Sequence, residues 1–326
     1  MKVAVTGASG HIGANLIRKL IDRGDKVRVL QNKTNLAFKN LDVNIVEGNL
    51  NNTGSLIGLC DDVEIVYHLA ARISIGNFSL EQLMKVNFTG TENVINACKE
   101  TGVKRMVHFS SIHAYKHEPL DVPLTESNEL NLESNIVYER TKALAEELVL
   151  KNAMENGLEI VVVNPTAVVG PWDFGPSYLG QFLIRLYKKK IPALIPGGYD
   201  WVDVRDIADG AIAAALRGVN GEKYILSGNW LSLKELTEFA GRASGKNLRV
   251  PVIPYFLGVI GLPFIQTWAK LKNEHPLYTR ESLQILQSGN KNIQHIKAAK
   301  ALGYVPRPFN ITLKDTFNWY KLNKYI

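Results

Sequence analysis

Short apolar runs alternate with amphipathic helical segments along the first half of the chain. The runs are rich in valine and isoleucine and show no regular polar alternation, which predicts parallel strands buried on both faces. We expect strands at Val3–Val5, Val27–Leu30, Asn44–Glu47, Ile65–His68, Met106–Phe109 and Ile160–Val163. Helical patterns lie between them at His11–Arg23, Ser55–Cys60, Leu80–Thr101 and Ile136–Asn156. The order predicts an α/β fold with a doubly wound parallel sheet.

Past about residue 170 the regular alternation is lost. The local signals there are loops at Gly170–Pro171 and Gly175–Pro176 and short strands at Lys223–Leu226 and Leu248–Val250. Asp203–Leu216 predicts a helix that returns to the first unit. We therefore expect a first domain over residues 1–170, with 200–217 returning to it. Residues 171–326 are expected to form mainly a second lobe, smaller and mostly helical.

A glycine loop joins the first strand to the first helix. Gly7 permits a tight turn, Gly10 lets the backbone approach a pyrophosphate, and Gly13 lets the helix pack on the strand. The helix N-terminus then offers free N–H groups to phosphates. The spacing Gly-x-x-Gly-x-x-Gly fits the general fingerprint only in part, but its position directly after the first strand indicates a Rossmann-type dinucleotide cradle. The expected cofactor contacts in this loop are Gly7, Ser9, Gly10, His11, Ile12 and Gly13.

Three residues further along suit hydride transfer between a nicotinamide and a carbonyl or alcohol. Lys142 lies four residues after Tyr138 and so on the same face of a helix. Free tyrosine titrates at about pH 10, and a neighbouring ammonium is expected to lower that pKa toward the range of general acid–base catalysis. Tyr138 would protonate the forming alkoxide, and Lys142 would also bind the nicotinamide ribose. Ser111 would orient the carbonyl oxygen.

The end of the second strand bears on the choice between NADP and NAD. An NAD site usually has an acidic residue here for the ribose hydroxyls, but the sequence is Leu30-Gln31-Asn32-Lys33. Without a carboxylate to repel a 2′-phosphate, and with Lys33 and Arg28 available to attract it, NADP is favoured over NAD. The alternative is that Asn32 and Lys33 are solvated residues of a turn.

With these residues, the chain resembles the extended short-chain dehydrogenases/reductases of the NAD-dependent epimerase/dehydratase superfamily over nearly its whole length. Gly48-Asn49-Leu50 stands where that family usually has Gly-Asp-Leu, whose acid contacts adenine. His68-Leu69-Ala70-Ala71 resembles the strand-four motif that lines the cofactor. Asn87 resembles the helix asparagine that supports the active site and its proton relay. The resemblance therefore implies cofactor contacts at Asn49, Leu50, Leu69, Ala70 and Ala71.

Two subfamilies compete for the match. Sugar-nucleotide epimerases and dehydratases usually carry Arg-x-x-Asn-x-Tyr-Gly-Pro after the sixth strand, but Asn164 and Ala167 occupy the arginine and asparagine positions here. Tyr199 stands where those enzymes often have another arginine for the diphosphate. The segment 165–171, Pro-Thr-Ala-Val-Val-Gly-Pro, instead resembles the dihydroflavonol 4-reductase-like branch.

That branch also resembles 3β-hydroxysteroid dehydrogenases, and its substrates are often apolar. It implies an NADP-dependent reductase of a ketone or aldehyde, with Pro165 and Val168 flanking the nicotinamide. One alternative is an NAD-dependent nucleotide-sugar epimerase or dehydratase. A second is a non-catalytic NADP-binding redox sensor, which would have no need of the Ser111, Tyr138 and Lys142 set. Family practice suggests a homodimer through the long helices.

Composition narrows the remaining classes. Hydrophobic residues make up 46% of the 326 residues and charged residues 21%, which is typical of a globular protein. The formal net charge of +7 is carried by scattered lysines without a basic stripe interleaved with aromatics, so no nucleic-acid partner is expected. Cys60 and Cys98 are expected to be buried free thiols rather than a disulfide or metal site. Without a signal peptide at the N-terminus, we expect a cytoplasmic protein.

One strongly apolar stretch, Val252–Ile265, is broken by Pro254 and Pro263. A spanning helix needs about 20 apolar residues, so no membrane crossing is expected. We interpret the stretch as a wall of the substrate pocket; a lipid-facing surface element is the alternative.

The cofactor preference can be tested at Lys33, the nearest cation after the second strand. Lys33→Ala should weaken NADPH binding more than NADH binding, because only NADPH carries the 2′-phosphate. Fluorescence titration of the cofactor-stripped protein with both nucleotides measures the difference. Equal losses would mean that the 2′-phosphate binds elsewhere.

Overall fold

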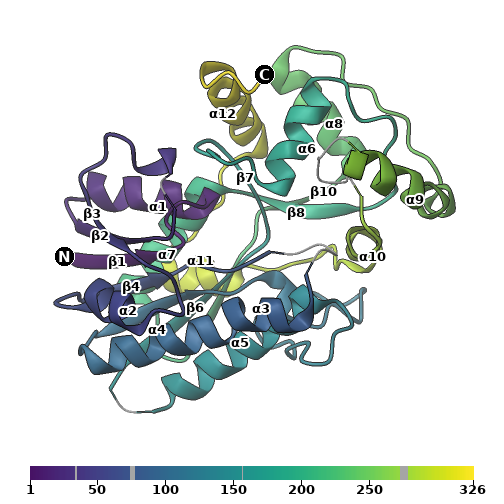
Figure 1. Cartoon of the computed structure of the whole chain (residues 1–326). Helices are drawn as coiled ribbons and strands as arrows, with labels where there is room; N and C mark the ends of the chain where they lie inside the picture. Colours follow the sequence, from purple (N-terminus) through teal and green to yellow (C-terminus); the bar gives the residue numbers. More distant parts are fainter. Residues whose placement is uncertain (34, 74–77, 156, 272–277) are drawn as a thin grey trace.

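Seven parallel strands form the central sheet in a computed structural model of the chain (Figure 1). The structure describes residues 1–33, 35–73, 78–155, 157–271 and 278–326, without the side chains of 264–266 and 268–270. The strands are β1 (Lys2–Thr6), β2 (Lys26–Gln31), β3 (Val43–Glu47), β4 (Ile65–His68), β5 (Arg105–Phe109), β6 (Glu159–Pro165) and β9 (Lys223–Leu226). Their spatial order is β3-β2-β1-β4-β5-β6-β9, which confirms the predicted Rossmann-type topology.

Helices cover both faces of this sheet (Figure 1). One face packs against α1 (His11–Asp22), α7 (Val204–Arg217) and α11 (Ile296–Leu302), the other against α2 (Thr53–Cys60), α3 (Leu80–Asn87), α4 (Thr89–Glu100) and α5 (Val137–Ala153). Successive strand residues point to opposite faces. Val3 and Val5 therefore join the core under α1 and α7, while Ala4 joins the core on the other side. This two-sided burial explains the continuous apolar runs.

The single helix expected over Leu80–Thr101 is broken at Phe88 into α3 and α4. The Thr91 hydroxyl donates to the Asn87 carbonyl, 2.7 Å away, and such a bond to the residue four positions earlier bends helices. Hydrogen bonds of the Asn87 side chain to neighbouring segments, described below, also fix this residue in place. The predicted helix over Ile136–Asn156 is α5, which ends at Ala153, and Asn156 lies outside the described residues.

A second lobe follows β6 and is mostly helical, as predicted. It holds a three-stranded sheet of β7 (Ala167–Val169), β8 (Gly198–Asp203) and β10 (Asn229–Ser232). Around it lie α6 (Tyr178–Tyr187), α8 (Leu233–Ser244), α9 (Tyr255–Leu271), α10 (Arg280–Ser288) and α12 (Phe309–Leu322). The lobe has its own core, centred on Trp201, Leu236 and Phe317. The exact domain boundaries stay a prediction.

Two further expectations concern local structure. The strand predicted at Leu248–Val250 is absent; instead Val252 forms an isolated bridge with Leu194, because the chain leaves α8 and turns along the lobe. Cys60 and Cys98 are buried free thiols. Among the helices that can be described, none has both the length and the apolar character needed to span a bilayer.

A buried ionic network connects the end of β8 and the start of α7 to the C-terminal part of the chain. Asp203, whose side chain is fully buried, receives an Arg205 bond at 2.7 Å, and Arg205 also reaches Asp315 at 2.7 Å on α12. Arg307 lies 2.6 Å from Asp206 and 3.7 Å from Asp203. Two buried carboxylates at the start of α7 therefore depend on arginines from different segments.

Removing one of these arginines should be costly. Arg307→Met should lower the free energy of unfolding by at least about 2 kcal/mol, because it leaves buried carboxylates short of a cation. The matched control is Lys116→Met, which breaks an exposed pair with Glu129 and should leave the free energy of unfolding nearly unchanged. Urea unfolding measures both. Equal losses in the two variants would contradict this account.

Candidate active site

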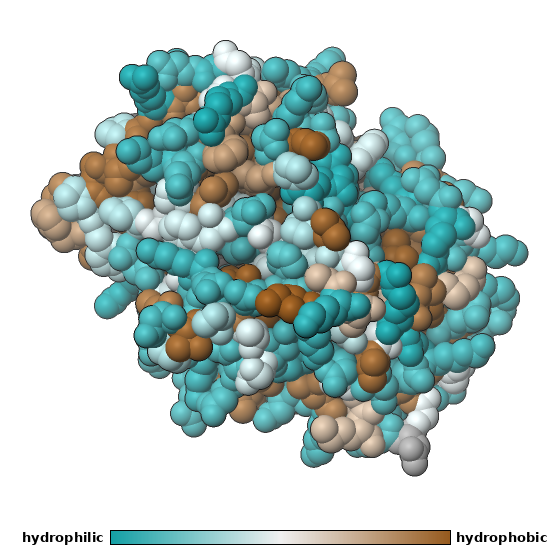
Figure 2. Space-filling model, turned by 180° about the vertical axis from the view of Figure 1, so that it is seen from behind, coloured by the Kyte–Doolittle hydropathy of each residue, from teal (hydrophilic) through white to brown (hydrophobic). Residues whose placement is uncertain are grey.

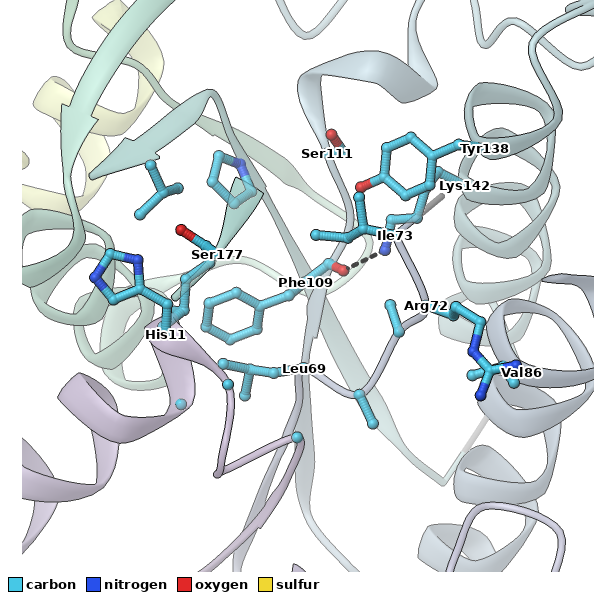
Figure 3. A pocket seen from close by; sticks show the side chains of 18 of the residues that line it. His11, Leu69, Arg72, Ile73, Val86, Phe109, Ser111, Tyr138, Lys142 and Ser177 are labelled. Atoms are coloured by element: carbon cyan, nitrogen blue, oxygen red, sulfur yellow. Dashed lines mark hydrogen bonds between the residues drawn. The ribbon is translucent and has the colours of Figure 1, made fainter. Parts of the chain in front are cut away.

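A cavity of about 900 Å³ lies between the carboxyl ends of the parallel strands and the second lobe (Figure 3). Doubly wound sheets place their ligands at this edge. Segments that follow β1 through β6 line one side, and residues from α6, β8 and α10 line the other. The volume is in the range of sites for small molecules and cofactors.

The glycine loop has the geometry of a phosphate cradle. Gly7 has φ +72°, and a Cβ there would lie 2.6 Å from the Ala70 nitrogen. A Cβ on Gly13 would lie 2.3 Å from the Gly7 oxygen, so α1 packs too closely on the loop for any side chain. Gly10 caps α1 without a side-chain bond, which leaves the first-turn N–H groups open to an anion. The loop therefore fits a dinucleotide pyrophosphate.

Most predicted contacts with the adenosine half of the cofactor line the cavity. Asn49 lies there, and its Oδ1 accepts a bond from the Asn51 nitrogen at 2.9 Å, which shapes the turn after β3. Lys33 is exposed and stands outside the cavity lining, next to Asn32, which belongs to it. The expectation for Arg28 was wrong. Its guanidinium donates to three carbonyl oxygens at the C-terminus of α2, those of Gly58, Leu59 and Asp61.

Ser111, Tyr138 and Lys142 all line the same cavity. Ser111 follows β5, and α5 carries Tyr138 and Lys142 on one face. The Lys142 ammonium donates to the Phe109 carbonyl at 2.7 Å. The Ser111 hydroxyl accepts from the backbone N–H of His113 at 3.2 Å. In Figure 3 the Tyr138 hydroxyl and the Lys142 ammonium extend into the same part of the cavity.

The pKa of Tyr138 differs from the expectation. Burial raises it to about 12, although the Ser111 hydroxyl acts in the opposite direction. Burial also lowers the pKa of Lys142 to about 8. The predicted lowering of the Tyr138 pKa by Lys142 is therefore absent, since the ammonium is bound to the Phe109 carbonyl and loss of solvation dominates. At neutral pH the phenol keeps its proton.

A buried carboxylate, Glu146, lies one turn beyond Lys142 on α5. Its Oε2 accepts from the Asn164 amide at 2.7 Å, and the Lys223 ammonium is 3.9 Å from its Oε1. Burial raises the pKa of Glu146, while Ser110, Lys223, Asn164 and Lys142 partly counter that effect. Asn164 is thus committed to this polar cluster in the core and does not line the cavity.

Asn87 is buried behind the cavity rather than in its lining. Its Oδ1 accepts from the Arg72 nitrogen at 2.8 Å, and its amide donates to the Arg72 oxygen and to the Thr141 hydroxyl, both at 3.1 Å. The side chain therefore holds the loop after β4 against α5, beside Lys142. From this position the Asn87 side chain could act on a reacting atom in the cavity only through another group.

The segment after β4 divides between core and cavity. His68 is buried, with its ring nitrogens 2.7 Å from the Thr6 hydroxyl and 2.9 Å from the Thr91 hydroxyl. Burial lowers the pKa of His68 to about 3, so the ring is neutral. Leu69, Ala70 and Ala71 line the cavity, as do Pro165 and Val168 after β6.

Sequence reasoning missed the end of the cavity beside the second lobe, apart from Tyr199, which it named only as a position without an arginine. Its lining there includes Ile73, His113, Thr166, Ser177, Tyr178, Leu179, Tyr199, Ser282 and Ile285. His113 could have been found, because it follows Ser111 by two residues. The lobe residues come from separate elements and share no motif. The expected wall Val252–Ile265 was wrong for its described side chains: none lines this cavity, and the side chains of Phe264 and Ile265 lie outside the description.

Comparison with known proteins agrees with this geometry. The sequence profile described as the NAD dependent epimerase/dehydratase family matches residues 3–227. The chain is 31% identical over 327 residues to sterol demethylase protein B of Methylococcus capsulatus, covering 98% of both chains. It is 29% identical over 333 residues to a protein of Synechocystis named provisionally as a dihydroflavonol 4-reductase, covering 99% and 95%.

A solved structure matches over the same extent. The crystal structure of gox2253 is 30% identical and superposes with a TM-score of 0.85, covering 99% of each chain. The two relatives and this structure thus match nearly the whole chain, and the sequence profile matches residues 3–227 of it.

The raised pKa of Glu146 predicts a specific dependence of stability on pH. The native state holds this proton more tightly than the unfolded chain, so stability is lost as the pH rises from the ordinary glutamate range through the raised pKa. Glu146→Gln removes that loss and keeps an acceptor for Asn164. Relative to the wild type, its melting temperature should therefore increase steadily with pH.

The exposed neighbour Glu147 provides the control, since Glu147→Gln should give a curve parallel to the wild type. Thermal unfolding from about pH 4 to about pH 8 covers the range. A parallel curve for Glu146→Gln would mean that Glu146 ionises normally in the native state.

Proposed function

The chain belongs to the NAD dependent epimerase/dehydratase family, and from that premise we propose that it is an NADP-dependent reductase that converts a ketone or aldehyde to an alcohol. The observation that carries the proposal is the meeting of Ser111, Tyr138 and Lys142 in one cavity with the glycine cradle. In this proposal the first domain, 1–170 with 200–217, binds the cofactor. The lobe within 171–326 binds the substrate.

The protein's own residues would perform the proton chemistry. When bound, the nicotinamide cofactor supplies the hydride. The Ser111 hydroxyl donates a hydrogen bond to the substrate carbonyl oxygen and holds it beside Tyr138. Tyr138 gives its phenolic proton to that oxygen as it becomes an alkoxide, which leaves an alcohol and a phenolate. The Lys142 ammonium, buried in the same wall, stabilises the phenolate.

The protonation state of Tyr138 supports the reductive direction. With its pKa raised to about 12 by burial, the phenol carries its proton throughout the neutral range. A proton donor needs that form, whereas alcohol oxidation would need the phenolate.

Support for NADP comes from the residues after β2. No acid follows that strand, and Asn32 lines the cavity beside exposed Lys33. With Arg28 bound to α2, we assign the 2′-phosphate contact to Asn32 and Lys33.

Support for a neutral, largely apolar substrate comes from the charges in the cavity. Among the described residues that line the cavity, the lysines and arginines are limited to Arg72 and Lys142. A nucleotide-sugar diphosphate would need further cations beyond those that serve the cofactor. The names of two relatives refer to a sterol and a dihydroflavonol, both multi-ring compounds. We therefore propose a ring ketone or related carbonyl compound.

The proposal is tested by Tyr138→Phe, which removes the phenolic proton and little else. Turnover of a panel of polycyclic and aromatic ketones with NADPH should fall by roughly two orders of magnitude or more, while NADPH affinity stays unchanged. Tyr255→Phe, on the exposed start of α9, is the control and should keep full activity.

Near-normal turnover in Tyr138→Phe would refute its role as proton donor. Tightly retained NAD in the purified protein, together with no carbonyl reduction, would instead favour a nucleotide-sugar epimerase. NADPH binding without turnover on any carbonyl would favour a redox sensor.

A further inference from the structure

Helix α9 carries large apolar side chains on its outward side. Gly258 and Leu262, four residues apart, are buried, and a Cβ on Gly258 would lie 2.3 Å from the Ile195 side chain. This close seating turns the opposite side of the helix to solvent. Phe256 is 60% exposed and Ile260 is 62% exposed. A helix on a protein surface normally has polar residues on that side.

The exposed apolar residues form one surface, which we call the α9 face. Its members are Val252, Tyr255, Phe256, Leu257, Val259 and Ile260. Figure 2 shows hydrophobic residues gathered at the left edge of the molecule, where α9 lies in that view. Contiguous exposed apolar patches are uncommon on proteins without a partner and mark sites of protein or membrane interaction.

Cations border the α9 face. Lys188, Lys189 and Lys190 follow α6, and Lys246 and Arg249 follow α8; all five are exposed. None of them forms an ion pair with another residue that the structure describes. The surrounding sequence has no acidic residue between Asp173 and Asp200 or between Glu238 and Glu274. The two basic segments therefore carry positive charge that acidic residues of their own stretches of sequence do not balance.

Backbone contacts hold these two basic segments at the start of α9. The Leu194 nitrogen donates to the Pro251 oxygen at 2.8 Å, and the Ile253 nitrogen donates to the Leu194 oxygen at 2.9 Å. The Lys246 ammonium lies 3.6 Å from the ring centroid of Tyr187, the residue before the lysine run. Apolar face and cations are thus parts of one fixed surface.

We propose that the α9 face docks on the surface of an anionic lipid bilayer. The apolar side chains of the face enter the boundary between headgroups and acyl chains, and the bordering lysines and arginine contact lipid phosphates. The arrangement needs no shaped partner, since the bilayer adapts to the protruding side chains. The apolar helix face matches the acyl-chain boundary of the bilayer, and the unpaired cations match its anionic headgroups.

Docking would bring the cavity close to the lipid. Helix α10 packs against α9 and supplies Ser282 and Ile285 to the cavity lining. The substrate end of the cavity would thus lie near the bilayer surface. The docking proposal itself does not depend on the proposed reductase activity.

Co-sedimentation of the full-length protein with vesicles tests the proposal. The protein should bind vesicles of phosphatidylglycerol and phosphatidylcholine, bind pure phosphatidylcholine much less, and be released as salt rises from about 0.1 M to about 0.5 M. Phe256→Ser with Ile260→Ser should weaken binding at least about tenfold. Lys188→Glu with Lys190→Glu should abolish the preference for anionic lipid.

The matched control is Leu216→Ser with Val219→Ser, which removes exposed apolar side chains far from α9 and should leave vesicle binding unchanged. Circular dichroism and melting temperature establish that each variant is folded. Wild-type protein that stays in the supernatant overturns the proposal, as does equal binding by the α9 variant. A dimer in solution that the α9 variant dissociates, without vesicle binding, would show that a second copy covers the face.

Discussion

The buried ammonium of Lys142 and its bond to the Phe109 carbonyl organise the whole site. A cation with little access to water needs a fixed acceptor, and the last carbonyl of β5 provides one. This bond fixes α5 relative to the sheet. It therefore determines where Tyr138 stands, one turn earlier on the same helix, and how Ser111, just past β5, faces it. Glu146, one turn later, is buried outside the cavity lining, where it accepts from Asn164.

Around that contact, polar side chains lie in two layers, one in the cavity lining and one in the core behind it. Ser111, Tyr138 and Lys142 line the cavity, and the core behind it carries groups that stay bonded to each other. Asn87 and Asn164 belong to the second set, because their amides hold backbone segments and a carboxylate in place. Both asparagines connect parts of the chain that are distant in sequence. The geometry of Ser111, Tyr138 and Lys142 thus rests on side chains that do not line this cavity.

The sequence predicted the features that local pattern determines. Valine-rich runs gave the strands, and the glycine loop gave the cradle, because a positive φ at Gly7 and a close approach at Gly13 admit no other residue. Features set by three-dimensional burial could not be foreseen. The pKa of Tyr138 depends on lost solvation, and Arg28 turns to the C-terminus of α2. The exposure of Phe256 and Ile260 on α9 agrees only with the alternative interpretation of that apolar stretch. The side of the cavity that the second lobe lines comes from α6, β8 and α10, which share no motif.

The position of β9 in the sheet has a consequence for synthesis on the ribosome. This edge strand pairs with β6, although the segment between them includes β7, α6 and β8 of the other lobe. The apolar sheet face under α1 is likewise covered only when α7 and α11 are present. A nascent chain that has emerged only as far as β6 therefore lacks the helices α7 and α11 that complete the core over this sheet face. That core is completed only once α11, which ends at Leu302, has left the exit tunnel, so the two lobes mature together.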